Sequence, residues 1–215
     1  MTDGTGIRRA RRESLAERRE RRGAVDDPAA VLDAAARFLE ARSRSVAEVR
    51  RRLTGAGYRA ELVDGAIARL LEIGILDDEV FARLWVESRD RAHPRGEAAL
   101  RRELRLKGVE PAVIDAVLAE RDSPSDGGER DEATDDGEGG DPTDGDDRRE
   151  LGRGSATADS TAADRLLARS ARTLARVADA RVRRQRAYAL LARHGFDPDT
   201  ASDAVRRFLT ESDPA

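Results

Sequence analysis

One motif occurs three times in this chain, and it limits the possible folds more than any other feature. Each copy has an arginine-rich segment with a leucine, then a glycine, an apolar residue and a second apolar-periodic segment. The copies occupy residues 49–67, 100–118 and 187–205, and the third is the most diverged. Units of this kind bury their apolar faces against neighbouring units and build extended helical arrays. The motif therefore predicts a helical array, an architecture that serves binding more often than catalysis.

The glycine of each copy predicts where the first helix ends. Glycine takes the left-handed conformation at a helix C-terminus, and the next apolar side chain packs back on the last turn. In two copies the following helix is expected to begin at an acidic residue followed by proline, whereas Arg59-Ala60 is a weaker start in the first. The motif residues are Leu53, Gly57 and Tyr58, then Leu104, Gly108 and Val109, then Leu191, Gly195 and Phe196.

A further apolar stripe precedes each pair of helices, so each unit is expected to have three helices and the chain nine. No segment alternates apolar and polar residues strongly enough to predict a strand. We therefore expect an all-α fold, an elongated array of three tandem three-helix repeats with a disordered acidic insert and a flexible leader. The expected segments are the arginine-rich leader (1–26), the repeats (27–74, 75–121 and 161–210), the acidic linker (122–160) and a tail (211–215).

The net charge of −3 conceals a strong segregation of charge along the chain. Residues 122–160 hold 14 Asp or Glu and four Arg, a balance of −10, whereas residues 161–215 hold 11 Arg and seven Asp or Glu, a balance of +4. The acidic segment is rich in Gly and Pro and cannot offset its chain entropy by burial. The simpler interpretation is a solubilising linker, and the alternative is a segment that folds back on basic helices and competes with a polyanion.

Basic side chains cluster on the middle helix expected in each unit. The motif leucines on these helices must point inward, so many of the cations must point outward. Three equivalent clusters favour a surface for a polyanion or an acidic protein over solvated helix faces balanced by nearby acids. Contacts with phosphates would give salt-dependent binding without base specificity, and the aromatic-poor chain offers no obvious stacking platform. The candidate binding residues on these helices are Arg50, Arg51, Arg101, Arg102, Arg105, Lys107, Arg183 and Arg184.

The sequence gives little support for catalysis. His93 and His194 are the only histidines and lie outside metal-ligand spacings, and the acidic residues 77–79 fit a helix cap better than a metal site. The chain has no cysteine, no apolar run of the roughly 20 residues that a membrane span needs, and no secretory signal. We therefore expect a cytoplasmic, monomeric binding protein that is not an enzyme, with no catalytic residues, cofactor, metal or membrane partner.

Residues 74–118 resemble the signature of the RecX regulatory family. The resemblance extends over residues 29–120 and 162–210, although in the third unit only the Gly195-Phe196 turn matches. The matching features in the second unit are Leu76-Asp77-Asp78, Phe81-Ala82, Ser88-Arg89, Arg95-Gly96, Leu100 to Leu104 and Lys107-Gly108-Val109. Those in the first unit are Leu39, Arg42-Ser43, Glu48-Val49 to Leu53, and Gly57-Tyr58.

The resemblance implies three tandem three-helix repeats and a non-enzymatic regulator of the RecA recombinase in DNA repair, recombination and the SOS response. It implies binding to the RecA filament on single-stranded DNA, with inhibition of its ATPase, strand-exchange and co-protease activities. The acidic insert and the arginine-rich leader depart from the family's common core, and the insert leaves the placement of the third unit open. Two alternatives remain: a stand-alone nucleic-acid-binding helical module, and a generic helical-repeat scaffold for another protein.

Overall fold

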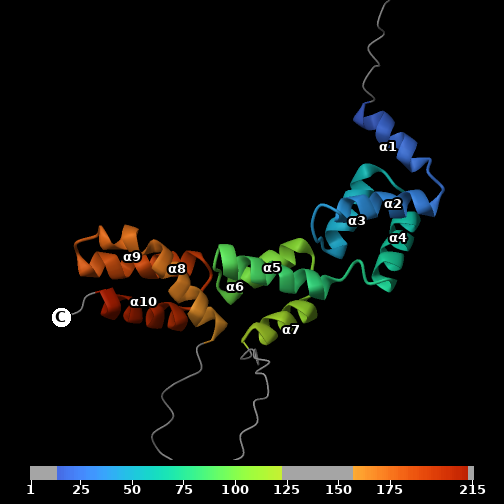
Figure 1. Ribbon diagram of the computed structural model, residues 1–215. Helices are drawn as coiled ribbons and strands as arrows, with labels where there is room; N and C mark the ends of the chain where they lie inside the picture. Colours follow the sequence, from blue (N-terminus) through green and yellow to red (C-terminus); the bar gives the residue numbers. More distant parts are fainter. Residues whose placement is uncertain (1–13, 123–156, 213–215) are drawn as a thin grey trace, which may run out of the picture. The chain divides into compact units, whose positions relative to one another are not determined.

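The computed structural model describes residues 14–122 and 157–212, and within them it contains ten helices and no strand (Figure 1). The predicted all-α class is therefore confirmed. The helices are α1 (Leu15–Gly23), α2 (Pro28–Leu39), α3 (Val46–Ala56), α4 (Ala60–Glu72), α5 (Asp78–Ala92), α6 (Glu97–Lys107), α7 (Pro111–Asp122), α8 (Ala158–Ala175), α9 (Ala180–Arg193) and α10 (Pro198–Ser212).

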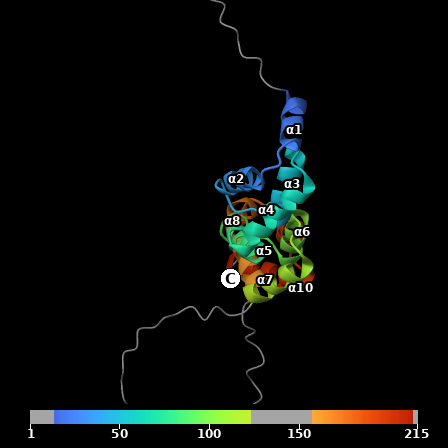
Figure 2. The same cartoon turned by 90° about the vertical axis from the view of Figure 1, so that its right-hand side faces the viewer.

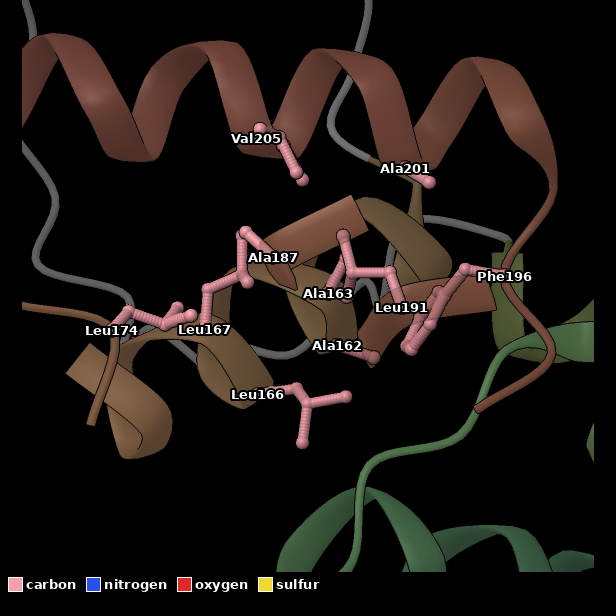
Figure 3. Packing of buried hydrophobic residues seen from close by; sticks show 11 residues of the cluster. Ala162, Ala163, Leu166, Leu167, Leu174, Ala187, Leu191, Phe196, Ala201 and Val205 are labelled. Atoms are coloured by element: carbon pink, nitrogen blue, oxygen red, sulfur yellow. The ribbon is translucent and has the colours of Figure 1, made fainter. Parts of the chain in front are cut away.

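Contacts divide the described residues into two compact units. These two units are not the three expected repeats. Unit 1 lies within Met1–Trp85 and Glu103–Ile114, and unit 2 lies within Val86–Arg102 and Asp115–Ala215. In unit 1, α2, α3 and α4 enclose a core that includes Val31, Leu53 and Leu70. In unit 2, α8, α9 and α10 pack together around a core rich in alanine and leucine, and Ala201 and Val205 of α10 face this core (Figure 3).

The motif glycines end their helices as predicted. Gly57, Gly108 and Gly195 have φ angles of 104°, 82° and 84°, which only glycine adopts without strain. The amide after each glycine donates to the carbonyl of the motif leucine, as in a Schellman cap. These hydrogen bonds run from Tyr58 to Leu53 (3.3 Å), from Val109 to Leu104 (3.2 Å) and from Phe196 to Leu191 (3.3 Å).

The starts of the helices also follow the sequence. Asp27 caps α2, whose first residue is Pro28, and Ser45 forms a capping box with Glu48 at the start of α3. The weaker start expected at Arg59 is confirmed, because this residue makes no side-chain cap to α4.

The flexible leader expected over residues 1–26 is wrong for Leu15–Gly23, which forms α1. A capping box of Ser14 and Glu17 begins this helix, and the sequence signal is the Ser-x-Ala-Glu pattern that also begins α3. The sequence predicts no helix here because α1 lacks the stripe of buried apolar residues that marks the helices of the repeats. The other residues of the expected leader before Ser14 lie outside the described part of the chain.

Polar and backbone contacts hold α1 against the C-terminal end of α3 (Figure 2). The guanidinium of Arg22 lies 5.8 Å from the centroid of the Tyr58 ring and donates to the Ala56 carbonyl at 3.5 Å. A Cβ on Gly57 would meet the Arg19 carbonyl oxygen at 2.8 Å, so the backbones of α1 and α3 approach closely. This helix therefore depends on the same glycine that ends α3.

The acidic linker expected over residues 122–160 lies mostly outside the described residues, since positions 123–156 are not described. The third set of helices begins slightly earlier than expected, because Thr157 caps α8. The amide of Ala158 donates to Asp122 Oδ1 at 3.2 Å. The two ends of the acidic segment therefore lie next to each other within unit 2.

Substitution of Gly108 by alanine should lower the stability of the fold. The left-handed conformation costs a non-glycine residue about 1–2 kcal/mol, and the new Cβ would also collide with Ala47. Gly65→Ala is the matched control, because Gly65 lies inside α4 and no atom lies near the Cβ that alanine would add. This variant should have a free energy of unfolding about 0.5–1 kcal/mol higher than the parent. Urea unfolding measures both changes, and equal stabilities for the two variants would contradict the role of Gly108.

Candidate binding surface

The eight candidate cations lie on the middle helices of the three-helix repeats, as the sequence predicts. Arg50 and Arg51 lie on α3, and Arg183 and Arg184 lie on α9. The other four, Arg101, Arg102, Arg105 and Lys107, lie on α6. Their environments differ, and these differences separate cations that hold the fold together from cations that face solvent.

Arg50 and Arg101 are equivalent residues that form ion pairs inside their own repeats. Each stands three residues before its motif leucine, and each pairs with an aspartate 14 residues later, Asp64 and Asp115. Arg101 also contacts Glu97 at 2.7 Å. Hydrogen bonds to Glu97 and Asp115 raise the pKa of Arg101. Both arginines therefore connect the middle helix to the helix that follows it.

Lys107 is half-buried in unit 1 and already has partners. Its Nζ lies 2.8 Å from Glu48 Oε1 and 4.7 Å from the centroid of the Trp85 ring. Its carbonyl accepts a hydrogen bond from the Ser45 hydroxyl at 2.6 Å. These contacts join the start of α3 to the end of α6, so Lys107 has a structural role.

The carboxylate of Glu48 is the acidic half of this contact. Burial alone would raise the pKa of Glu48, but hydrogen bonds from Lys107 and the Ser45 amide outweigh it and hold the pKa below its ordinary value. Nearby, Asp78 Oδ1 accepts the amide of Val46 at 2.8 Å. A carboxylate from α5 therefore caps the N-terminus of α3.

A corresponding contact in unit 2 centres on Arg121, which the sequence did not single out. Its side chain is only 7% exposed, and it lies 2.8 Å from Asp90 and 2.5 Å from Asp159. Burial alone would lower the pKa of Arg121, but its hydrogen bonds to the two aspartates outweigh that effect and keep it charged. Asp159 Oδ2 also accepts the Glu97 amide at 2.9 Å, so a carboxylate from α8 caps α6.

Four of the eight candidate cations are exposed, and the described residues form no hydrogen bond or ion pair with their side chains. Arg183 is half-buried and takes part in a contact within the protein. On α6, the exposed cations stand beside Leu106, which is 73% exposed. The four exposed cations are Arg51, Arg102, Arg105 and Arg184.

The described residues also bear on the expectations for metal binding, helix capping and membrane spans. Within residues 14–122 and 157–212, no group of His, Cys, Asp or Glu is placed to hold a metal ion. Asp77 caps α5 through the amides of Glu79 (2.7 Å) and Val80 (3.1 Å), as the sequence predicts. In the same described ranges, no helix has both the length and the apolar character needed to cross a membrane.

The described helices define a helical-repeat fold. Residues 32–70 match the model of the first three-helix domain of RecX, and residues 77–118 match that of the second. These two segments, which together make up less than half of the chain, therefore match RecX three-helix domains.

Individual relatives agree with this assignment. The "Regulatory protein RecX" of Mycobacterium sp. (strain JLS) is 45% identical over 87 residues, which are 40% of this chain and 48% of that protein. That of Pelodictyon phaeoclathratiforme is 39% identical over 89 residues, 41% of this chain and 56% of the relative. The chain thus spans about half the length of the curated relatives it matches.

Solved structures support the fold over more of the chain. The crystal structure of RecX from Lactobacillus salivarius superposes with a TM-score of 0.63 at 14% identity, covering 85% of this chain and 97% of that one. Another RecX crystal structure gives a TM-score of 0.59 at 16% identity, covering 85% of this chain and 71% of the other. At these identities, the likeness concerns the fold alone.

Glu48→Gln should reduce stability in a pH-dependent way. Because the pKa of Glu48 is lower in the folded chain, its ionised form stabilises the fold above the ordinary value of 4.5, and this is lost as the pH falls through the folded pKa. We expect the free energy of unfolding of the variant to lie about 1–3 kcal/mol below that of the parent at pH 7, and the difference to be smaller near pH 3. Urea unfolding at the two pH values measures it. The same difference at both pH values would contradict the contact with Lys107.

Proposed function

We propose that this chain is a non-enzymatic, cytoplasmic regulator that binds, as a monomer, to the RecA filament on single-stranded DNA. Binding lowers the ATPase, strand-exchange and co-protease activities of the filament. The match of residues 32–70 and 77–118 to RecX domains supports this partner, because the resemblance to that family implies regulation of RecA. The observation on this chain that carries the proposal is the set of exposed cations on the middle helices, which the fold leaves available to an acidic ligand.

The contacts divide the eight candidate residues by role. We assign Arg101 and Lys107 to stability, since each is partly buried and paired with a carboxylate of this chain. Arg50 also pairs with a carboxylate, Asp64, but both side chains are exposed, so its contribution to stability is smaller. Arg183 stands next to Arg184 and is half-buried, so we assign it a supporting role. The exposed residues Arg51, Arg102, Arg105 and Arg184 are left to contact DNA phosphates or acidic surfaces of RecA.

This assignment predicts a particular kind of binding. Each phosphate contact on a single strand contributes about 0.7 to the slope of log affinity against log salt, whatever the base sequence. Weak contacts on several protomers add up when they are made by one molecule, so a helical array could hold a filament without a deep cleft. The regulator would then act by occupying the filament rather than by chemistry.

Titration of the cognate RecA should show inhibition of its DNA-dependent ATP hydrolysis at less than one molecule of this protein per RecA protomer. The measurement is ATP hydrolysis on a single-stranded DNA circle, combined with pelleting of the filament. Tight binding to naked DNA with no effect on RecA would favour a stand-alone nucleic-acid module. Binding to neither DNA nor filament would favour a scaffold for another protein.

Reversal of three exposed charges should weaken filament binding while the fold stays intact. We expect Arg51→Glu, Arg102→Glu and Arg105→Glu together to raise the half-inhibitory concentration at least about tenfold, because three phosphate or carboxylate contacts become repulsive. The control reverses three other exposed arginines, Arg165, Arg172 and Arg176, and so makes the same change in net charge. Equal effects of the two triple variants would contradict the assignment.

A further inference from the structure

The third motif copy departs from the first two at a pair of matched positions. Three residues before the motif leucine, Tyr188 replaces the arginine found as Arg50 and Arg101. Fourteen residues later, Ser202 replaces the aspartate that pairs with that arginine. An internal ion pair in the first two copies is therefore replaced by two neutral side chains in the third.

These two side chains line a groove between α9 and α10. The groove has a volume of about 530 Å³, within the range of roughly 300–1,000 Å³ found for ligand pockets. The side chains from α9 are spaced three and four residues apart, so they share one face of that helix. The lining residues are Arg181, Arg184, Gln185, Tyr188, Ser202, Val205 and Arg206.

An extra helical turn brings arginines to this groove. The helices α3 and α6 begin seven residues before their motif leucines, at Val46 and Glu97, whereas α9 begins eleven residues before Leu191, at Ala180. The additional residues include Arg181, which stands one turn from Arg184 and two turns from Tyr188. The third copy has therefore gained cations beside the position where it lost the ion pair.

The charges along this groove are unbalanced. Arg181 and Arg184 are exposed, and the described residues offer them no carboxylate partner. Arg206 contacts Asp203 at 2.9 Å, but both side chains are largely exposed, so this pair holds the arginine weakly. Tyr188 is 37% exposed and Val205 is buried, so an aromatic ring and an apolar patch lie among the cations.

This combination matches the chemistry of an unpaired nucleotide. Arginine presents a planar fork of donors that fits phosphate oxygens, and a tyrosine ring offers a stacking surface to any base. An acidic peptide would use the cations and would leave the ring without a partner. We propose that the groove between α9 and α10 binds single-stranded nucleic acid, with phosphates on Arg181 and Arg184 and one base stacked on Tyr188.

This site deepens the proposed function, because it gives the single-stranded DNA of the filament a binding place on the regulator. It also supplies the stacking surface that the aromatic-poor sequence did not suggest. The groove can be tested without RecA, so the two proposals can fail separately.

The experiment measures binding of a fluorescein-labelled oligothymidylate to the full chain by fluorescence anisotropy. Tyr188→Ala should weaken binding by about 5- to 150-fold, the range for loss of one stacked base, whereas Tyr188→Phe keeps the ring and should bind as the parent does. Arg181→Gln with Arg184→Gln should lower affinity and reduce the salt slope by about 1.4, for two phosphates. The charge-matched control is Arg165→Gln with Arg172→Gln, on α8, which should leave the affinity within about twofold of the parent.

Unfolding transitions of each variant establish that the fold is retained, which is expected because Tyr188 and both arginines are at the surface. The proposed binding site would be overturned if the Tyr188→Ala variant bound the oligonucleotide with parental affinity. It would also be overturned if the α8 control lost as much affinity as the variant with Arg181→Gln and Arg184→Gln. A parent protein that binds the oligonucleotide through this groove but leaves RecA activity unchanged would overturn only the proposed function. Inhibition of RecA with parental oligonucleotide binding in all variants would overturn only the groove.

Discussion

The structure depends on one contact, made twice: a carboxylate at the start of a later helix caps the N-terminus of an earlier middle helix. In unit 1, Asp78 accepts the amide of Val46 at 2.8 Å, and in unit 2, Asp159 accepts the amide of Glu97 at 2.9 Å. A second hydrogen bond accompanies each contact and reaches the residue before a motif glycine. It runs from the Ser45 hydroxyl to the Lys107 carbonyl at 2.6 Å, and from the Gly96 amide to the His194 carbonyl at 3.0 Å. The cap satisfies helix amides that would otherwise be unpaired.

This contact also decides which cations are available to a ligand. Buried or half-buried carboxylates need cationic partners, because an isolated ionised carboxylate is costly to desolvate. Lys107 serves that purpose for Glu48, which lies beside the cap in unit 1, and Arg121 serves it for Asp159 in unit 2. Arg50 and Arg101 instead pair with the exposed residues Asp64 and Asp115 inside single repeats. The arginines that are left over face solvent, and the proposed filament surface is made of these. The basic residues of the repeats therefore divide into those that form internal ion pairs and those that form the proposed binding surface.

The backbone was more predictable than the partners of the side chains. The glycine caps and helix starts follow from residues within one turn of each other, so the sequence predicts them directly. The sequence did not predict the helix α1, because this helix packs through Arg22 and backbone atoms instead of an apolar stripe. The sequence also did not predict the roles of Lys107 and Arg121, because their partners Glu48 and Asp159 lie 59 and 38 residues away along the chain. Of the candidate site, the sequence predicted which helices carry cations but not which cations are occupied.

The most direct test of this account is a double-mutant cycle between Arg121 and Asp159. Urea unfolding of the parent, of Arg121→Ala, of Asp159→Ala and of the double variant gives the free energy that couples the two side chains. Contacting charged residues couple by about 0.5–3 kcal/mol, and because Arg121 is only 7% exposed we expect a value in the upper half of that range. Additive losses, with a coupling energy near zero, would mean that this contact does not hold unit 2 together and would contradict the account.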